Sequence, residues 1–409
     1  MRPVKLFLRG EFWDSQIYSG ELILFGADGA LHRLNWAAVV DQLASQHSSI
    51  QTALRVAFSD GDLFYTQKVQ RILRDPAIES VIKKQLVDLA SLSISADRSV
   101  WGQHWRTGDT PFNFLPTDTD VYYNRLFAAG DDGLFSAPRG TQSSTFRKHH
   151  DGRVLQVKAS DQNTAVAAAG GVDGLFEFAY ESQNEKVLDR RRRVANIPCS
   201  AFDWAFQSIV GWNDESLFFA SYREDRDPHS KKKVRTFDQL IRQEQILASQ
   251  DLVTHGPTRF WGSHEKLFCV SSEGLEVLNY TPPSSGPRAE KSGVRQRARF
   301  SRRGKLAVEF DLNDVISTGT APFGAVLEFA DRVVVLRSDG GVDVFDGEAV
   351  HWRVFPRSEH YNNQLHIIYE DSLLIVSFLH DYFLEQTTKL MGFARGSNDY
   401  ARLEDVGGY

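Results

Sequence analysis

Short apolar runs of strand length recur along the chain, and polar turns separate them. In the clearest copies an Asp-Gly or Glu-Gly pair joins two runs rich in Val, Leu and Phe. Asp-Gly supplies the positive φ angles of a tight turn, so each copy predicts a β-hairpin. In two weaker copies, the runs 216–222 and 372–378 lead into polar turns at 223–227 and 380–381. The predicted turns therefore number seven and lie near residues 28, 132, 173, 223, 273, 340 and 380.

The spacing of these hairpins predicts the architecture. Most intervals are about 40–50 residues, and a β-hairpin at that period is typical of propeller blades. We therefore predict an all-β, closed seven-bladed β-propeller that forms a single domain over 1–409. The segment from Val4 to Phe12 is strand-like but has no hairpin of its own. We expect its residues 5–8 to pair with the C-terminal blade, which hides two strand edges.

The longest interval between hairpins carries a helical pattern. Asp75 and Pro76 are typical of a helix start, and five apolar residues then fall on one face at three- to four-residue spacing. We predict a helical insertion over 64–95, after the first hairpin, whose apolar face packs on the propeller or alternatively binds another protein. A second, weaker helix is predicted to begin near Thr236. The five residues of the apolar face are Ile78, Val81, Ile82, Leu86 and Leu89.

A second interruption has a different composition. Residues 281–305 begin with Pro, Ser and Gly and continue with closely spaced Arg and Lys. Low hydrophobicity and like charge predict a flexible basic loop.

The arrangement of hairpins resembles β-propellers of the WD-repeat or quinoprotein-like kind over nearly the whole chain. The resemblance is one of architecture and implies no specific family. The Gly-His and Trp-Asp signature of WD repeats is missing, and so is the double glycine of kelch repeats.

Composition narrows the class of protein. The formal net charge of −6 gives no overall basic field for nucleic acid. Cys199 and Cys269 have neither disulfide nor zinc spacing, and we expect both to be buried apolar residues. The N-terminal residues lack the apolar run of a signal peptide, and no run reaches 18 apolar residues. We therefore predict a cytoplasmic protein.

Candidate catalytic residues are sparse. The richest group is His351, His360, His366 and His380, but no pair has the i,i+4 spacing of helical metal ligands. We interpret them as surface or hydrogen-bonded histidines, and we place His149 and His150 in a turn. A Gly-x-Ser-x-Gly motif and a phosphate-binding loop are both missing. We therefore predict no enzymatic activity and no catalytic, metal or cofactor-binding residues.

Three basic runs stand out against the negative net charge. They could be solvated loops, but we predict that they bind a partner. The main hypothesis is a non-enzymatic scaffold, adaptor or regulatory subunit, such as a bacterial regulator, that docks a protein through its loops and helical insertion. One alternative is a nucleic-acid-associated propeller, and a second is a hydrolase or lyase with its site in the central channel. The predicted partner-binding residues are Arg190, Arg191, Arg192, Arg193, Lys231, Lys232, Lys233, Arg295, Arg297, Arg299, Arg302 and Arg303.

Overall fold

The computed structural model contains seven sheets among the residues it describes, six of them antiparallel and one mixed. The chain divides into two compact units, which are Met1–Asn113 with Ile316–Arg402 and Phe114–Val315 with Leu403–Tyr409. Each unit is described by itself below, and the single domain over 1–409 stays a prediction. The described residues are 2–59, 67–139, 146–181, 187–226, 233–248, 259–263, 266–271, 274–283, 297–306, 311–312, 314–337, 340–358 and 360–378.

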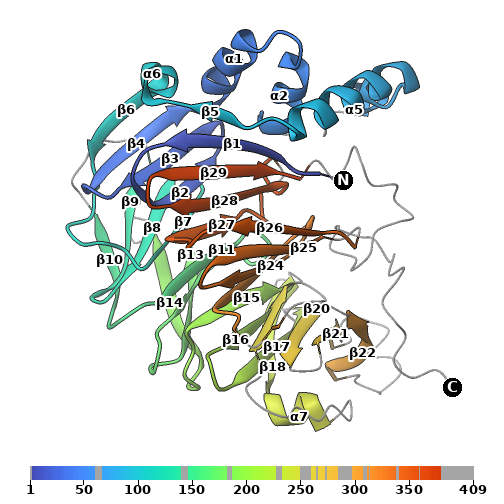
Figure 1. Cartoon of the computed structure of the whole chain (residues 1–409). Helices are drawn as coiled ribbons and strands as arrows, with labels where there is room; N and C mark the ends of the chain where they lie inside the picture. The colour runs from blue at the N-terminus through green and yellow to red at the C-terminus, as the bar shows by residue number, and fades with distance from the viewer. Residues whose placement is uncertain are drawn as a thin grey trace, which may run out of the picture. The chain divides into compact units, whose positions relative to one another are not determined.

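Three sheets belong to the first unit (Figure 1). One consists of β2 (Phe12–Tyr18), β3 (Glu21–Gly26), β4 (Ala30–Asn35) and β6 (Trp105–Asp109). Another consists of β23 (Ser317–Ala321), β24 (Gly324–Phe329), β25 (Arg332–Arg337) and β26 (Val342–Asp346). The third consists of β27 (His351–Val354), β28 (Gln364–Tyr369), β29 (Ser372–Ser377), β1 (Val4–Arg9) and β5 (Ile94–Ala96).

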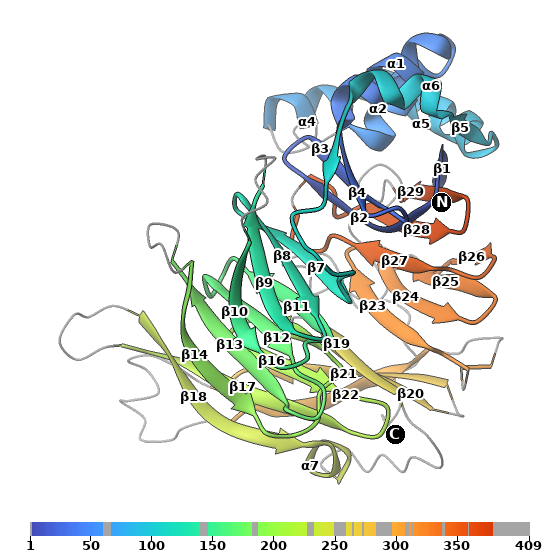
Figure 2. The ribbon, with the colours of Figure 1, turned by 90° about the vertical axis from the view of Figure 1, so that its left-hand side faces the viewer.

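Four sheets belong to the second unit (Figure 2). The first two are β7 (Asp118–Tyr122), β8 (Arg125–Gly130), β9 (Gly133–Pro138) and β10 (Arg147–Asp151), then β11 (Gln156–Ser160), β12 (Ala165–Ala169), β13 (Leu175–Tyr180) and β14 (Leu188–Ala195). The other two are β15 (Ala201–Ala205), β16 (Ser208–Trp212), β17 (Leu217–Arg226) and β18 (Lys233–Arg242), then β19 (Arg259–Ser263), β20 (Lys266–Ser271), β21 (Gly274–Thr281) and β22 (Arg299–Leu306).

Six four-stranded sheets and one five-stranded sheet are the blades of a propeller, so the prediction of an all-β, seven-bladed propeller is confirmed. The first strands of successive sheets contact one another within each unit, as β7 does with β11 and β2 with β27. These strands are therefore the inner ones, and the fourth strands are the outer ones. Apolar clusters fill the spaces between neighbouring sheets in each unit.

The N-terminal strand completes the last blade, as the sequence predicted. β1 pairs antiparallel with β29, with Lys5 opposite Val376 and Leu8 opposite Leu373. Its other edge pairs in parallel with β5, so both edges of β1 are hydrogen-bonded. Leu6 and Leu8 are fully buried.

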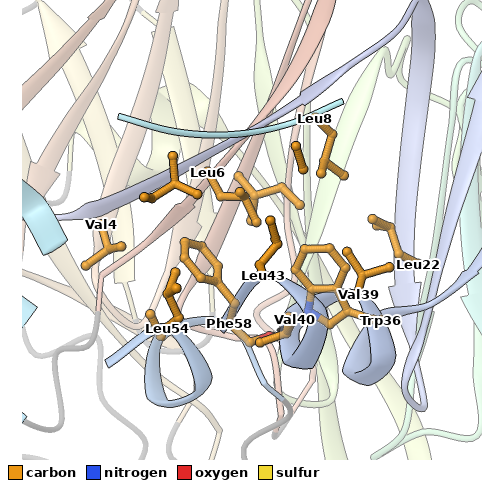
Figure 3. Packing of buried hydrophobic residues seen from close by; sticks show 14 of the residues in the cluster. Val4, Leu6, Leu8, Leu22, Trp36, Val39, Val40, Leu43, Leu54 and Phe58 are labelled. Atoms are coloured by element: carbon orange, nitrogen blue, oxygen red, sulfur yellow. Dashed lines mark hydrogen bonds between the residues drawn. The ribbon is translucent and has the colours of Figure 1, made fainter. Parts of the chain in front are cut away.

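The helical insertion lies between β4 and β6 and covers β1. Its helices are α1 (Trp36–Gln46), α2 (Gln51–Phe58), α4 (Gln67–Leu73), α5 (Pro76–Ala90), α6 (Arg98–Trp101) and the 3-10 turn η1 (Gly102–His104). Figure 3 shows Trp36, Leu43 and Phe58 of α1 and α2 beside Leu6 and Leu8 of β1. The buried side chains of α5 are Ile82, Leu86 and Leu89, so part of its predicted apolar face packs inward. Ile78 and Val81, which were assigned to the same face, are exposed.

The insertion follows the first hairpin, as predicted, but it is longer than 64–95. Helix begins at Trp36, directly after β4, where Asn35 Oδ1 accepts a hydrogen bond from Ala38 N. The predicted start at 64 missed α1 and α2. The apolar residues of α1 follow directly on the strand pattern of β4, which hides their helical spacing.

Two other predictions are corrected. The helix expected from Thr236 begins only at Gln243, as α7 (Gln243–Ala248), because residues 233–242 pair in register with β17 as the strand β18. The basic loop expected over 281–305 ends earlier. Arg299–Leu306 is the strand β22, which pairs with β21, and residues 284–296 lie outside the described part.

The two weakly marked hairpins differ from the prediction in where the chain turns. The predicted turn at 223–227 is largely strand, since β17 continues to Arg226. The turn that precedes β17 is built on Asn213, whose Oδ1 accepts hydrogen bonds from the N–H groups of Glu215 and Ser216. An Asn side chain thus replaces the expected Asp-Gly pair. The turn before β29 lies at 370–371, and the predicted turn at 380–381 lies outside the described residues.

Candidate protein-interaction surface

The outer strand β14 carries four consecutive exposed arginines, Arg190–Arg193. A regular strand sends alternate side chains to opposite faces, so an unbroken exposed run needs an irregularity. The register supplies one, because Arg192 pairs with Glu177 and Asp189 with Ala179, which leaves two arginines opposite a single residue of β13. Arg190 also has a positive φ of 50°. This β-bulge turns the strand and displays its guanidinium groups.

Arg191 and Arg193 are held in place by neutral groups. Arg191 Nη1 lies 3.1 Å from His150 Nδ1, and Arg193 Nη2 donates to the Asp173 carbonyl oxygen at 2.6 Å. Both guanidinium groups also lie within 6 Å of the Phe176 ring centroid, at 5.8 and 5.9 Å. Burial lowers the pKa of His150, and the charge of Arg191 lowers it further. Neither partner cancels the arginine charge, so two ordered cations remain on this strand.

Arg192 has a different role, because it shares one carboxylate with Arg235 of β18. Glu177 Oε1 lies 2.8 Å from Arg192 Nη2, and Glu177 Oε2 lies 2.5 Å from Arg235 Nη1. Both guanidinium groups also lie over the Tyr222 ring, at 4.8 and 3.7 Å from its centroid. Arg235 donates through Nε to the carbonyl oxygen of Gln207 as well. These bonds join two neighbouring sheets, so Arg192 and Arg235 stabilise the unit.

The other predicted partner-binding residues lie on β18, on or before β22, or outside the described residues. Lys233 begins β18, and Lys231, Lys232 and Arg295 lie outside the described residues. Arg297 and Arg299 are exposed, whereas Arg303 is half-buried in β22. Arg302 forms a bidentate pair with Glu276, at 3.0 and 2.6 Å, inside its own sheet. Sequence reasoning therefore grouped residues with two roles, exposed cations and structural ion pairs.

The strand β10 adds residues that the sequence analysis missed. His149 and His150, predicted in a turn, lie in this strand. His150 is buried against Phe176, 4.5 Å between ring centroids. Arg147 is exposed, and exposed Lys148 pairs with Asp151 at 2.7 Å. The signal in the sequence was weak, because Arg147 and Lys148 form only a short basic pair and the neighbouring blade decides which side chains meet.

Two of the histidines near the C-terminus, His366 and His351, contact a polar network in the first unit. His366 Nδ1 lies 2.9 Å from Ser15 Oγ, and both residues are fully buried. Burial, and then the charge of Arg353, lowers the pKa of His366 to about 3. Arg353 forms a bidentate pair with buried Asp14, 2.8 Å in both bonds. His351 lies beside this pair, 3.6 Å from Asp14, and His380 lies outside the described residues.

Inner-strand carboxylates in the second unit bond to the backbone of the next blade. Asp118 Oδ2 accepts from Val157 N at 2.9 Å, and Asp120 Oδ2 accepts from Ala159 N at 2.7 Å. Gln156 Oε1 repeats the arrangement one blade later with Phe202 N, at 2.8 Å. The described residues include no group of three His, Cys, Asp or Glu that could hold a metal ion. Both cysteines are buried, which raises the pKa of each thiol to about 12, as expected of inert residues.

Comparison with known proteins identifies no family. No protein-family model matches the sequence, and a search of curated proteins gives no significant match. Among solved structures, the chain is similar to the WD40 β-propeller domain of Doa1, with a TM-score of 0.45 and 10% identity over 91% of this chain and 95% of that one. It is also similar to the AfRom2 CNH domain, with a TM-score of 0.35 and 10% identity over 64% of this chain and 94% of that one. The propeller assignment rests on the seven sheets themselves.

Proposed function

We propose that the chain is a non-enzymatic protein-interaction module that binds an acidic segment of a partner protein on β14 and the neighbouring β10. The observation that carries the proposal is the ordered charge of Arg191 and Arg193, neither of which forms an ion pair with a carboxylate among the described residues. Guanidinium groups fixed before binding lose little conformational entropy when a carboxylate arrives. Arg190, which has no hydrogen bond or ion pair among the described residues, extends the cationic row.

A structural role for the same charges is the competing interpretation. β14 is an edge strand, and charged side chains on an edge prevent pairing with another sheet. The two interpretations differ in their consequences. Edge protection predicts self-association when the charge is removed, whereas docking predicts loss of an acidic ligand.

The experiment is a titration of the full chain with a fluorescent deca-glutamate peptide, followed by anisotropy. The triple substitution Arg190→Gln, Arg191→Gln and Arg193→Gln should weaken binding by at least about tenfold and leave the protein monodisperse. The matched control removes three cations of the helical insertion, Arg71, Arg74 and Lys84, and should bind as the wild type does. Wild-type binding that survives the triple substitution, or aggregation without any peptide binding, would refute the proposal.

The helical insertion is less suited to docking than the sequence suggested. Three residues of the predicted apolar face on α5, Ile82, Leu86 and Leu89, are buried, so this part of the face is not open to a partner. Loss of peptide binding in the insertion variant alone would move the docking surface to α4 and α5.

Nucleic acid is the alternative ligand for the arginine row. A 20-bp duplex would bind with an affinity that falls steeply with salt, with a slope of about −0.9 for each phosphate contact. The bulged strand lacks exposed aromatic side chains for stacking on bases. Duplex binding tighter than peptide binding at physiological salt would favour this alternative.

The central-channel hydrolase has less support. Its site would need convergent acidic, His or Asn side chains on inner strands, but Asp118, Asp120 and Asp14 bond to backbone N–H groups or to arginine. None of the helices among the described residues is long and apolar enough to cross a membrane. The cytoplasmic location and the bacterial source stay predictions.

A further inference from the structure

A second cationic cluster lies in the second unit, where the sheet β7–β10 meets β13 of the next sheet. Its members are Arg125 of β8, Arg147 and His149 of β10, and Tyr123 in the turn between β7 and β8. We propose that this cluster binds an aryl phosphate, presented as a phosphotyrosyl side chain of a partner protein. The proposal rests on the proposed function in that the partner is a protein, and the two sites share only the strand β10.

The guanidinium group of Arg125 is held in place by neutral groups. Its Nε and Nη2 donate to Ser136 Oγ at 3.2 and 3.1 Å. Ser136 is fully buried, and its Oγ lies 2.7 Å from His149 Nε2. Because this oxygen already accepts from arginine, its own proton is directed to His149. The guanidinium is thus fixed in place by a serine and a histidine.

His149 adds no negative charge and remains neutral. Burial lowers its pKa to about 4, and the charges of Arg125 and Arg147 lower it further. Burial also lowers the pKa of Arg125, and Arg147 acts in the same direction. Neither arginine is paired with a carboxylate in the part of the chain that the structure describes. Two neighbouring cations without an acid between them favour a dianion over a single carboxylate.

An aromatic stack lies beside this charge. The Tyr123 ring is parallel to that of Tyr180, at 11° and 5.2 Å between centroids. Tyr122 packs against both rings and donates from its hydroxyl to the Ser160 carbonyl oxygen at 3.3 Å. Arg125 lies opposite Tyr122 in the β7–β8 pair, so the guanidinium and the stack come from the same hairpin, and Arg125 also interacts electrostatically with Tyr180. Tyr123 is 48% exposed, which leaves part of its ring open to stack on another aromatic ring.

The backbone of Tyr123 is strained, which indicates that holding its ring in this exposed position costs conformational energy. Its φ is 50°, in the left-handed region that a bulky side chain rarely adopts. Asn or Gly would satisfy the same turn with less strain. Strained residues of this kind gather at binding sites, where the strain positions a side chain. The competing interpretation is that Tyr123 only covers Tyr180.

The experiment titrates the full chain with phenyl phosphate and with a phosphotyrosyl peptide, followed by calorimetry. The unphosphorylated peptide and inorganic phosphate should each bind at least about tenfold more weakly than the phosphopeptide. Arg125→Gln and the exposed Arg147→Gln should each weaken phosphopeptide binding by a similar factor. Arg147→Gln keeps the test valid if the half-buried Arg125 variant does not fold.

Tyr123→Asn separates the two interpretations of the ring. A binding role predicts weaker phosphopeptide binding together with a melting temperature that is unchanged or higher, because the strain is relieved. A covering role predicts a lower melting temperature and unchanged binding, which would overturn the aromatic part of the proposal. Equal affinity for inorganic phosphate would also overturn it, and tighter binding of a nucleoside monophosphate would reassign the site to nucleotides.

The two proposals fail separately. The substitutions of Arg190, Arg191 and Arg193 should leave phenyl phosphate binding intact, and Arg125→Gln should leave deca-glutamate binding nearly unchanged. Failure of phenyl phosphate to bind the wild type would refute the aryl phosphate site and leave the arginine row of β14 untouched.

Discussion

At the scale of single residues, buried and exposed ion pairs of the first unit should differ in their effect on stability. Asp14 is fully buried and holds Arg353 through two bonds, so Asp14→Asn leaves a largely buried guanidinium without its counter-charge. We expect a loss of about 3–5 kcal/mol in the free energy of unfolding, measured by urea denaturation. The control is Asp41→Asn, which breaks the exposed pair with Arg55 and should cost at most about 1 kcal/mol. Equal losses of unfolding free energy in the two variants would contradict the prediction that the buried ion pair of Asp14 contributes more to stability than the exposed pair.

The buried His366 predicts a dependence of stability on pH. Its folded pKa of about 3 lies below the ordinary value of 6.5, so the unfolded chain binds the extra proton between these values. Its contribution to stability is therefore complete above pH 6.5 and is lost as the pH falls toward 3. At pH 5 the loss should be about 2 kcal/mol.

The measurement compares urea unfolding at pH 7 and pH 5. His366→Gln lowers stability at both values, because Ser15 loses its partner, but it should reduce the difference between them. A difference that is the same in the variant and the wild type would show that His366 does not titrate as proposed. The wild type should show no comparable loss between pH 7 and pH 8.

At the scale of elements, the Asp-Gly hairpins differ in how much they depend on glycine. Gly29 and Gly174 both have positive φ, 81° and 89°. A Cβ on Gly174 would lie 2.2 Å from the Ala195 carbonyl oxygen, whereas a Cβ on Gly29 would meet nothing within 4 Å. Gly29→Ala should cost about 1–2 kcal/mol from backbone strain alone. Gly174→Ala should lower the free energy of unfolding by more, because β14 must also shift. Chemical denaturation of both variants measures this difference, and an equal loss of stability would contradict the prediction.

At the scale of the whole molecule, the N-terminal strand β1 completes a sheet whose other blade strands come from the C-terminal part of the chain. β1 bonds to β29 and β5 and packs under α1 and α2, so its removal exposes both a strand edge and an apolar cluster. Deletion of residues 2–9 should lower the melting temperature and make the protein prone to association. A peptide of residues 1–11 added in trans should restore the melting temperature. The same peptide with Leu6→Asp and Leu8→Asp is the control and should not restore it.

The architecture could be predicted from the sequence because its signals are local. An Asp-Gly pair between two apolar runs specifies a hairpin within about a dozen residues, and the repetition of that unit indicates a propeller. Where the local sequence lacked an Asp-Gly pair or resembled a helix, the predicted position of the turn or helix was wrong. Asn213 forms its turn through a side chain, and the residues after Thr236 continue as strand because β17 offers them a partner.

The candidate sites depend on tertiary structure. The sequence identified Arg190–Arg193 as a basic run, but only packing showed that Arg192 pairs with Glu177 while Arg191 and Arg193 keep their charge. Arg125, Arg147 and Tyr123 are spread over three elements and form no motif in the chain. Hairpin turns depend on residues that are neighbours in the sequence. Whether a carboxylate neutralises a guanidinium depends on the side chains of the neighbouring blade, and these come close only when the sheets pack.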